Sequence, residues 1–307
     1  MSSDAGIWQW KKQVCQYDAT KARNCRLDCR ACGRNHNPRI VFLDVTNRCN
    51  LNCPICIANI PGMGFEFHPP MAYFEHVAAG LAAMDPKPTV QLFGGEPTVR
   101  DDLFDIIALL QRHGLRVRIV TNGVRLADED YCKRVCALKI PVLLAFDGRD
   151  PEIYRRLRKS AGAYEKKVKA LENLKKHSLR KNILMCCVAR HVNDKHMADL
   201  VAFCHENRDM ISALHLIPLT ETWKEGEFET DVTTTIEDVE QIVAEAMPDA
   251  KEEYHSIEGA RLENCPSGFV YEDPDTGEVK TIPVCAWSLY RTGIQRKIAE
   301  KHSAARA

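Results

Sequence analysis

The sequence predicts an α/β fold: a partial (β/α)6 TIM-like barrel, with a Cys-rich N-terminal extension and a small C-terminal region made of a helix and a hairpin. From residue 40 onward, apolar runs alternate with amphipathic stretches, as expected for repeated βα units. The 307 residues, 45% of them hydrophobic, suffice for one large core. The predicted boundaries are 1–37 for the extension, 38–219 for the barrel and 220–307 for the C-terminal region.

The barrel elements follow one another in order along the chain. Short apolar runs predict strands at 40–45, 89–93, 117–120, 141–146, 182–190 and 212–218. Apolar residues at helical spacing predict helices at 71–84, 101–113, 128–138, 164–177 and 196–206. Asp101 and Asp102 stand in the first turn of the second helix, where the helix dipole favours anions. The catalytic face is expected at the C-terminal ends of the strands.

The region after the barrel has a different pattern. Residues 220–235 are polar and loop-like, and 236–247 predict a helix. A hairpin is expected at 269–283, with its turn at the Asp-Pro-Asp-Thr-Gly sequence. Because a hairpin brings its ends together, the flanking Cys265 and Cys285 are candidates to lie close to each other. The basic tail from 291 to 307 is expected to be solvated.

Composition narrows the classes of protein. Lys and Arg number 42, as do Asp and Glu, so bulk charge does not indicate a nucleic-acid or membrane-surface partner. The sequence has no apolar run long enough to span a bilayer and no signal-peptide pattern at its start. In such a chain, 14 cysteines indicate metal binding rather than disulfides and favour a cytoplasmic protein.

The most informative stretch is Cys49-Asn50-Leu51-Asn52-Cys53-Pro54-Ile55-Cys56, which follows the first predicted strand. Three thiolates can hold three irons of a [4Fe-4S] cluster and leave the fourth iron open. Zinc is the alternative, because Cys-x-x-Cys pairs also bind zinc. A zinc site needs a fourth ligand, and the next histidine is His68. The spacing alone leaves both possibilities open.

Downstream turns favour the cluster. Gly94-Gly95-Glu96-Pro97 ends the second predicted strand, and Thr121-Asn122-Gly123 ends the third. With the CxxxCxxC loop, these residues resemble the radical S-adenosylmethionine (SAM) superfamily, whose usual core is a partial barrel. The resemblance implies a [4Fe-4S] cluster on Cys49, Cys53 and Cys56, with SAM bound at the open iron. It also implies reductive cleavage of SAM to a 5′-deoxyadenosyl radical, which abstracts hydrogen from a substrate C–H bond.

The resemblance also implies roles for residues at strand ends. Gly94, Gly95 and Glu96 are expected at the SAM amino group, since glycines allow close approach and a carboxylate suits an ammonium. The alternative is an ordinary turn with an exposed Glu96. The further cofactor-binding candidates are Thr121, Asn122, Asp147 and Arg190. Asp147 is assigned to the ribose hydroxyls, because a carboxylate does not bind the SAM carboxylate.

The remaining cysteines fall into two groups. Cys15, Cys25, Cys29 and Cys32 crowd the extension, where an auxiliary iron–sulfur cluster is favoured over zinc, a single iron or free thiols. Cys265 and Cys285 are candidates to complete this site or to form another. Cys132 and Cys136 are predicted to be core residues. Cys186 and Cys187 are adjacent in a strand and face opposite ways, so one of them is expected to line the interior.

Three segments, at 58–71, 94–103 and 265–283, resemble the group of class D radical SAM methyltransferases and archaeal tetraether lipid synthases. That resemblance implies carbon–carbon bond formation at an unactivated carbon of a small molecule or lipid, by methylation or by coupling. It implies a reductant such as ferredoxin or flavodoxin. The alternatives are another radical SAM reaction or an iron–sulfur electron carrier. A carrier has no need of Glu96 and its glycines.

Overall fold

The computed structural model describes residues 38–58, 60, 63–223, 225–247 and 267–304. The predictions for residues 1–37, which include Cys15, Cys25, Cys29 and Cys32, lie outside these residues, as does Cys265. The chain divides into two compact units. The β1 unit contains the described parts of 14–49, 60–120 and 258–307, and the β5 unit contains those of 50–59 and 121–257. Each unit is named after a strand that it contains.

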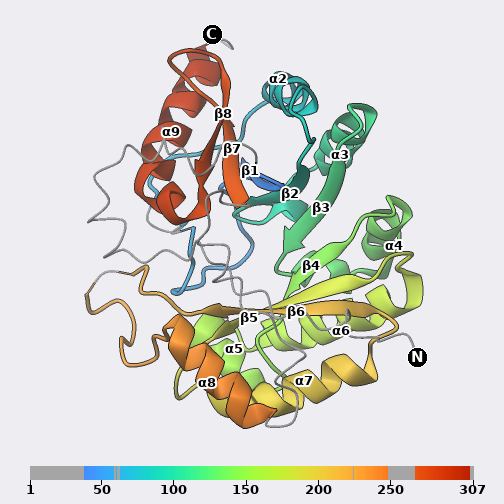
Figure 1. Ribbon diagram of the computed structural model, residues 1–307, viewed down its shortest axis with the longest axis vertical. Coiled ribbons are helices and arrows are strands. Elements are labelled where there is room, and N and C mark those ends of the chain that lie inside the picture. The colour runs from blue at the N-terminus through green and yellow to red at the C-terminus, as the bar shows by residue number, and fades with distance from the viewer. Residues whose placement is uncertain (1–37, 59, 61–62, 224, 248–266, 305–307) are drawn as a thin grey trace. The chain divides into compact units, whose positions relative to one another are not determined.

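The sheet of the β1 unit has the strand order β3-β2-β1-β7-β8 (Figure 1). Its strands are β1 (Ile40–Thr46), β2 (Thr89–Gly94), β3 (Arg116–Thr121), β7 (Ser267–Glu272) and β8 (Val279–Pro283). Strand β1 pairs in parallel with both β2 and β7, whereas β7 and β8 are antiparallel. The predicted hairpin is therefore confirmed, but its first strand also extends the parallel sheet.

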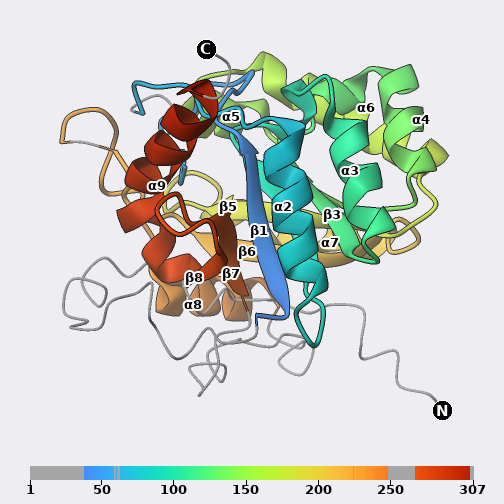
Figure 2. The same ribbon diagram turned by 90° about the horizontal axis from the view of Figure 1, so that it is seen from above.

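Helices cover the hairpin on both sides. Helix α2 (Met71–Ala82) and helix α9 (Val284–Ala304) each contact both β7 and β8, and they lie on opposite sides of them (Figures 1 and 2). Helix α3 (Leu103–Arg112) packs beside α2. On the α9 side, aromatic rings stack from strand to helix: the Phe42 and Phe269 centroids are 5.0 Å apart, and those of Phe269 and Trp287 are 4.9 Å apart.

The prediction of a solvated tail from residue 291 was wrong. Helix α9 buries Arg291 and Gln295 against Asp44 of β1. Asp44 Oδ2 accepts hydrogen bonds from Trp287 Nε1 at 3.1 Å, Arg291 Nε at 2.9 Å and Gln295 Nε2 at 2.6 Å. These three donors recur at a spacing of four residues on one helix face. The segment was predicted to be solvated because of its basic composition, and this spacing was not used.

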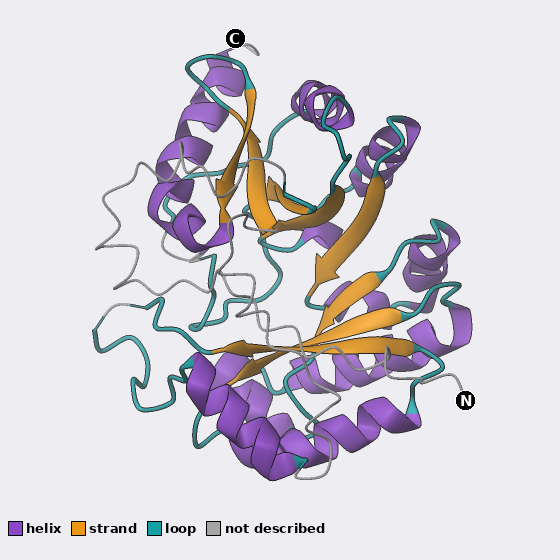
Figure 3. Cartoon of the chain, viewed as in Figure 1, coloured by secondary structure: helices purple, strands orange, loops and turns teal. Residues whose placement is uncertain are grey.

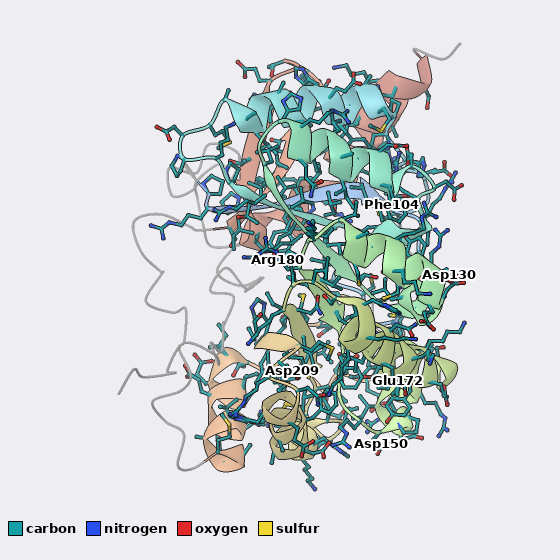
Figure 4. All side chains as sticks on the ribbon, turned by 90° about the vertical axis from the view of Figure 1, so that its right-hand side faces the viewer. Phe104, Asp130, Asp150, Glu172, Arg180 and Asp209 are labelled. Carbon is teal, nitrogen blue, oxygen red and sulfur yellow. The ribbon has the colours of Figure 1, made fainter. Side chains whose placement is uncertain are left out.

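In the β5 unit, β4 (Val142–Ala145), β5 (Asn182–Val188) and β6 (Ile211–Pro218) are parallel neighbours. Helices of this unit are α4 (Glu129–Ala137), α5 (Pro151–Arg158), α6 (Gly162–His177), α7 (Met197–Glu206) and α8 (Ile236–Ala246) (Figure 3). Short 3-10 turns stand at Pro97–Val99 in the β1 unit and at Val124–Ala127 and Asp194–His196 in the β5 unit. Solvent-facing carboxylates, such as Asp130 on α4 and Glu172 on α6, are labelled in Figure 4.

The predicted βα alternation is confirmed, and every predicted helix end lies within two residues of the observed one. Helix α5 was not predicted. It begins after Asp150, whose side chain accepts from Glu152 N, and ends at Arg158, which is followed by Lys159 with a φ of 50°. The core positions predicted for Cys132 and Cys136 are confirmed, since both are buried on α4. Within the described residues, no helix is long and apolar enough to cross a membrane.

Candidate active site

In the β1 unit, the glycine turn after β2 is bound to the backbone that leads into Cys49. Gly95 N donates to Thr46 O at 2.7 Å, and Glu96 N donates to Arg48 O at 2.9 Å. A Cβ on Gly94 would stand 2.2 Å from Thr46 O, and one on Gly95 would stand 2.3 Å from Arg48 O. The absence of a side chain at these glycines therefore lets the turn lie directly against the backbone that precedes Cys49.

Glu96 is buried, with 1% of its surface exposed, so the alternative of a turn with an exposed Glu96 is wrong. Its Oε1 accepts from Thr98 N at 3.0 Å and from Thr98 Oγ1 at 2.7 Å. These bonds fix the carboxylate at the start of the 3-10 turn that follows the motif. A buried carboxylate held in this way is a suitable partner for an ammonium group.

Arg100 fixes the end of β1 through hydrogen bonds. It was not among the predicted site residues. Its guanidinium donates to Val45 O at 2.8 Å and to Pro69 O at 3.0 Å, and it forms a bidentate pair with Asp102. Hydrogen bonding from Arg100 holds the pKa of Asp102 below its usual range, although burial opposes this. Asp102 therefore acts as the arginine's partner, and its side chain does not cap α3.

The loop after the cysteines returns to the same strand end. Asn47 Nδ2 donates to Phe65 O at 2.6 Å, and Asn47 Oδ1 accepts from Phe67 N at 2.8 Å. Asn47 N in turn donates to Phe67 O at 2.9 Å. Asn47 precedes Cys49 by two positions. The backbone on the N-terminal side of the cysteine loop is thus fixed by side-chain and main-chain bonds together.

In the β5 unit, the cysteine loop is anchored through Ile55. Cys53 and Cys56 are half-buried free thiols, and Cys49 in the β1 unit is also half-buried. Ile55 lies between Cys53 and Cys56 and is 5% exposed. It belongs to one apolar cluster with Ile153, Tyr154, Leu157, Ala189, Leu219, Trp223 and Val232. The loop therefore packs against α5, which the sequence did not predict.

Asn122 is the candidate that touches the cysteine loop within the β5 unit. Its Nδ2 donates to Asn50 Oδ1 at 2.7 Å, while its own Oδ1 accepts from Val124 N at 2.9 Å. Thr121 is buried, and its Oγ1 accepts from Gly123 N at 3.0 Å. Both side chains shape the turn after β3, and Asn122 links that turn to the loop.

Asp147 is fully buried, and both of its carboxylate oxygens have protein partners. Arg158 donates to them from Nε at 2.9 Å and from Nη2 at 2.8 Å, and Cys187 N donates at 3.1 Å. Burial acts to raise the pKa of Asp147, but the charge and hydrogen bonds of Arg158 outweigh it, so the pKa is lowered. The binding of Asp147 to the ribose hydroxyls of SAM remains a prediction. In that arrangement the carboxylate would have to keep its hydrogen bonds to Arg158 as well.

Arg158 and Lys167 place positive charge beside Cys53. Burial raises the pKa of the Cys53 thiol, and the charge of Arg158, a hydrogen bond from Arg158 and the charge of Lys167 oppose that rise. Lys167 is fully buried and donates to the carbonyls of Asn122 and Ala145. Neither cation was among the predicted site residues. Arg158 ends α5, a short helix of eight residues, most of them polar or charged.

Cys187 is the member of the β5 cysteine pair that packs against the cluster around Ile55, whereas Cys186 is fully buried. Burial raises the pKa of the Cys187 thiol to about 12 despite Arg158. Arg190 is half exposed and forms an ion pair with Asp238 of α8. Among the residues that the structure describes, no three His, Cys, Asp or Glu side chains are grouped to hold a single metal ion. Nothing is described for the Cys285 side chain.

Residues 43–204 match the family model of the radical SAM superfamily, and this chain belongs to that family. The match contains the cysteine loop, the glycine turn, Asp147 and Arg158. The predicted resemblance to the superfamily is confirmed.

Two curated relatives are similar to this chain over part of their length. A 7,8-dihydro-6-hydroxymethylpterin dimethyltransferase of Methanocaldococcus jannaschii is 34% identical over 213 residues, which cover 68% of this chain and 42% of the relative. An AdoMet-dependent heme synthase of Methanosarcina barkeri is 31% identical over 143 residues, which cover 45% of this chain and 40% of the relative. The chain thus spans about two fifths of the length of these relatives.

Two solved structures share the fold. Native anSMEcpe with bound AdoMet and Cp18Cys peptide matches with a TM-score of 0.54 and 21% identity, over 69% of this chain and 59% of that one. Streptococcus suis SuiB bound to the precursor peptide SuiA matches with a TM-score of 0.57 and 16% identity, over 82% of this chain and 60% of that one. These similarities confirm the predicted α/β fold class.

Proposed function

We propose that this protein binds a [4Fe-4S] cluster through Cys49, Cys53 and Cys56 and cleaves SAM reductively. The observation that carries the proposal is the bonding of the glycine turn to the backbone that leads into Cys49. The donor set fits the group, because three thiols can ligate three irons of such a cluster, and each of the three is half-buried. When bound, such a cluster would supply the one-electron chemistry, fed by an external reductant, that cleaves SAM to methionine and a 5′-deoxyadenosyl radical able to abstract hydrogen from a substrate.

The protein's own residues supply geometry in this proposal. Glu96 accepts a hydrogen bond from the SAM ammonium, and Asn122 orients the loop through Asn50. Gly94 and Gly95 keep the backbone before Cys49 in place. Ile55 and its apolar neighbours exclude water from the side of the loop that faces α5. An electron carrier would need the cysteines but not a buried Glu96 whose backbone is bonded to the residue before Cys49.

For the reaction itself we propose methylation at a carbon of a small heterocycle. The support is the 34% identity to a pterin dimethyltransferase over 68% of this chain. Other relatives act differently, including the heme synthase and a probable GTP 3′,8-cyclase. Coupling of lipid chains stays an alternative, which the resemblance to the tetraether lipid synthases motivates. Ferredoxin or flavodoxin is the proposed reductant.

The first experiment measures 5′-deoxyadenosine after anaerobic reconstitution, with dithionite as reductant and SAM in excess. The wild type is expected to release 5′-deoxyadenosine, and the Cys49→Ala/Cys53→Ala/Cys56→Ala variant is expected to release none. Cys204→Ala, at a buried free cysteine on α7, is the matched control and should retain wild-type cleavage. Cleavage at the wild-type rate by the triple variant would refute the assignment of the cluster.

The same assay addresses the reaction. With SAM, present in excess, as the methyl donor, adding 7,8-dihydro-6-hydroxymethylpterin should accelerate 5′-deoxyadenosine release and yield a product in which a methyl group replaces one hydrogen on carbon. If the pterin stays unmethylated and SAM is cleaved at the same rate with and without it, this pterin is not the substrate. The assignment of the cluster would be unaffected.

A further inference from the structure

Arg118 of β3 is a half-buried cation in the β1 unit. Burial lowers the pKa of its guanidinium, and the charge of Arg116, two residues earlier, lowers it further. Among the residues that the structure describes, neither arginine side chain forms a hydrogen bond or an ion pair. An arginine keeps its charge in such surroundings, and removing a charge from water is costly unless an anion offsets it.

The strand register places Arg118 on the face of the sheet that carries α9. Trp287 of α9 stacks on Phe269 of β7, and Phe269 stacks on Phe42 of β1. Phe42 is the register partner of Gln91 on β2, and Gln91 is the register partner of Arg118. Because register partners on parallel strands point to the same face, all of these side chains except that of Trp287 project from one face of the sheet.

The neighbours of Arg118 on this face are polar and aromatic. Arg116 is exposed and shares the face, since it lies two residues from Arg118 on the same strand. Gln91 is 4% exposed, and its amide makes no hydrogen bond to the described residues. Phe93 is half-buried, with its ring centroid 5.6 Å from that of Phe42. Two guanidinium groups and an amide are thus available as donors, and guanidinium forks match phosphate and carboxylate oxygens.

We propose that Arg118, together with Arg116 and Gln91, binds an oxyanion of the substrate, either a phosphate or a carboxylate group. The assignment of this anion to the substrate rests on the proposed function, whereas the anion site itself does not. Gln91 precedes Gly94 of the glycine turn by three residues, which is about 10 Å along a strand. A small heterocycle with an anionic group at one end can span that length, and Phe93 offers its ring in between.

The site is tested by calorimetric titration of the full-length protein with inorganic phosphate and, separately, with acetate. The wild type is expected to bind one of the two probes, and the probe that binds identifies the anion as phosphate or carboxylate. Arg118→Gln should weaken this binding roughly tenfold or more, because hydrogen bonds to charged groups are the stronger kind. Arg118→Lys keeps the charge but loses the fork, so its affinity should lie between the two.

Arg112→Gln is the matched control, because Arg112 is exposed at the end of α3 in the same unit and the variant removes the same charge. Its affinity for the probe should equal that of the wild type. A wild type that binds neither probe, or equal affinity in the wild type and Arg118→Gln, would overturn the anion site. If Arg118→Gln does not fold, the exposed Arg116→Gln decides, since it too should weaken binding.

The assignment to the substrate is tested in the 5′-deoxyadenosine assay. It compares 7,8-dihydro-6-hydroxymethylpterin with its phosphate ester, or with the corresponding 6-carboxylic acid if acetate is the probe that binds. The charged pterin should half-saturate the wild type at a roughly tenfold lower concentration. In Arg118→Gln that advantage should disappear while the maximal rate is unchanged.

The two proposals fail in different ways. Equal half-saturation by the neutral and the charged pterin in the wild type, with the probe still bound at Arg118, would overturn only the assignment of the anion to the substrate. A wild type that does not cleave SAM would contradict the proposed function. The calorimetric comparison would still decide whether Arg118 binds an anion, because it requires no SAM cleavage.

Discussion

Gly95 leaves no room for a side chain, because a Cβ there would stand 2.3 Å from Arg48 O. We expect Gly95→Ala to displace the backbone before Cys49, at a cost of about 1–3 kcal/mol, typical of overpacking. Iron uptake on reconstitution should fall together with 5′-deoxyadenosine release. Iron per chain, measured beside the free energy of unfolding, separates a loop defect from general instability.

Gly293→Ala is the control for that substitution. A Cβ on Gly293 meets nothing within 4 Å, and the residue lies in α9. Alanine in a helix is favoured over glycine by roughly 0.5–1 kcal/mol, so this variant should be slightly more stable and fully loaded. Normal iron uptake by Gly95→Ala would contradict the idea that the glycine turn positions the cysteine loop.

Asp147 should give unfolding a specific dependence on pH. Its pKa is lowered in the folded protein, because the effect of Arg158 exceeds the effect of burial. Such a group contributes stability above its ordinary pKa of about 3.9, and that stability is lost as pH falls through the lower folded value. Asp147→Asn leaves Arg158 without its buried partner and should cost on the order of 3–5 kcal/mol at neutral pH.

Urea unfolding of wild type and Asp147→Asn at several pH values measures this. The difference between the two proteins should be constant from neutral pH down to the ordinary aspartate pKa and then shrink on further acidification. A difference that stays constant through the acid range would show that Asp147 is not ionised in the folded state.

Residues in turns were easier to predict than residues in pairs. Glu96 follows two glycines at a strand end, and that local pattern sufficed to single it out. The pairing of Asp147 with Arg158 joins positions 11 apart, and it depends on a helix whose sequence, Pro-Glu-Ile-Tyr-Arg-Arg-Leu-Arg, is mostly polar. Sequence periodicity identifies which residues are apolar, but it does not identify which buried charge will meet which.

At the scale of an element, α9 is attached to β1 by polar groups inside the β1 unit. The side chains of Arg291 and Asp44 are both 4% exposed. Burial raises the pKa of Asp44 even though Arg291 stands beside it. Arg291→Met should therefore lower the free energy of unfolding by about 3–5 kcal/mol, because it leaves a buried carboxylate without its cation.

Arg291→Met leaves the negative charge of Asp44 without a partner, and adding Asp44→Asn removes that charge. The double variant should therefore recover most of the lost free energy of unfolding. Lys297→Met is the control on the same helix. Lys297 forms an exposed pair with Asp275, and such pairs contribute about 1 kcal/mol or less. Chemical denaturation followed by circular dichroism measures all three variants. Equal stability of Arg291→Met and the wild type would mean that α9 is held by its apolar contacts alone.

At the scale of the whole molecule, the order of the strands and of the helices other than α5 and α9 could be predicted, because each βα unit repeats a local pattern. The parallel pairing of β1 with β7 could not, since these strands come from opposite ends of the described chain. No local signal marks such a pairing. The cysteine loop and the glycine turn could be located from their motifs, whereas the hydrogen bonds that join them became visible only once both strands were placed.

The pairing of β1 with β7 and α9 has a consequence during protein synthesis. Strand β1 obtains one neighbour from β2 early, but its other neighbour and the donors to Asp44 come from residues 267–304. At a ribosomal rate of roughly 5–20 residues per second, β1 waits about 10–50 s for them. Cys49 lies three residues beyond β1. The nascent chain therefore exposes its cysteine loop on an incomplete sheet until residues 267–304 have been made.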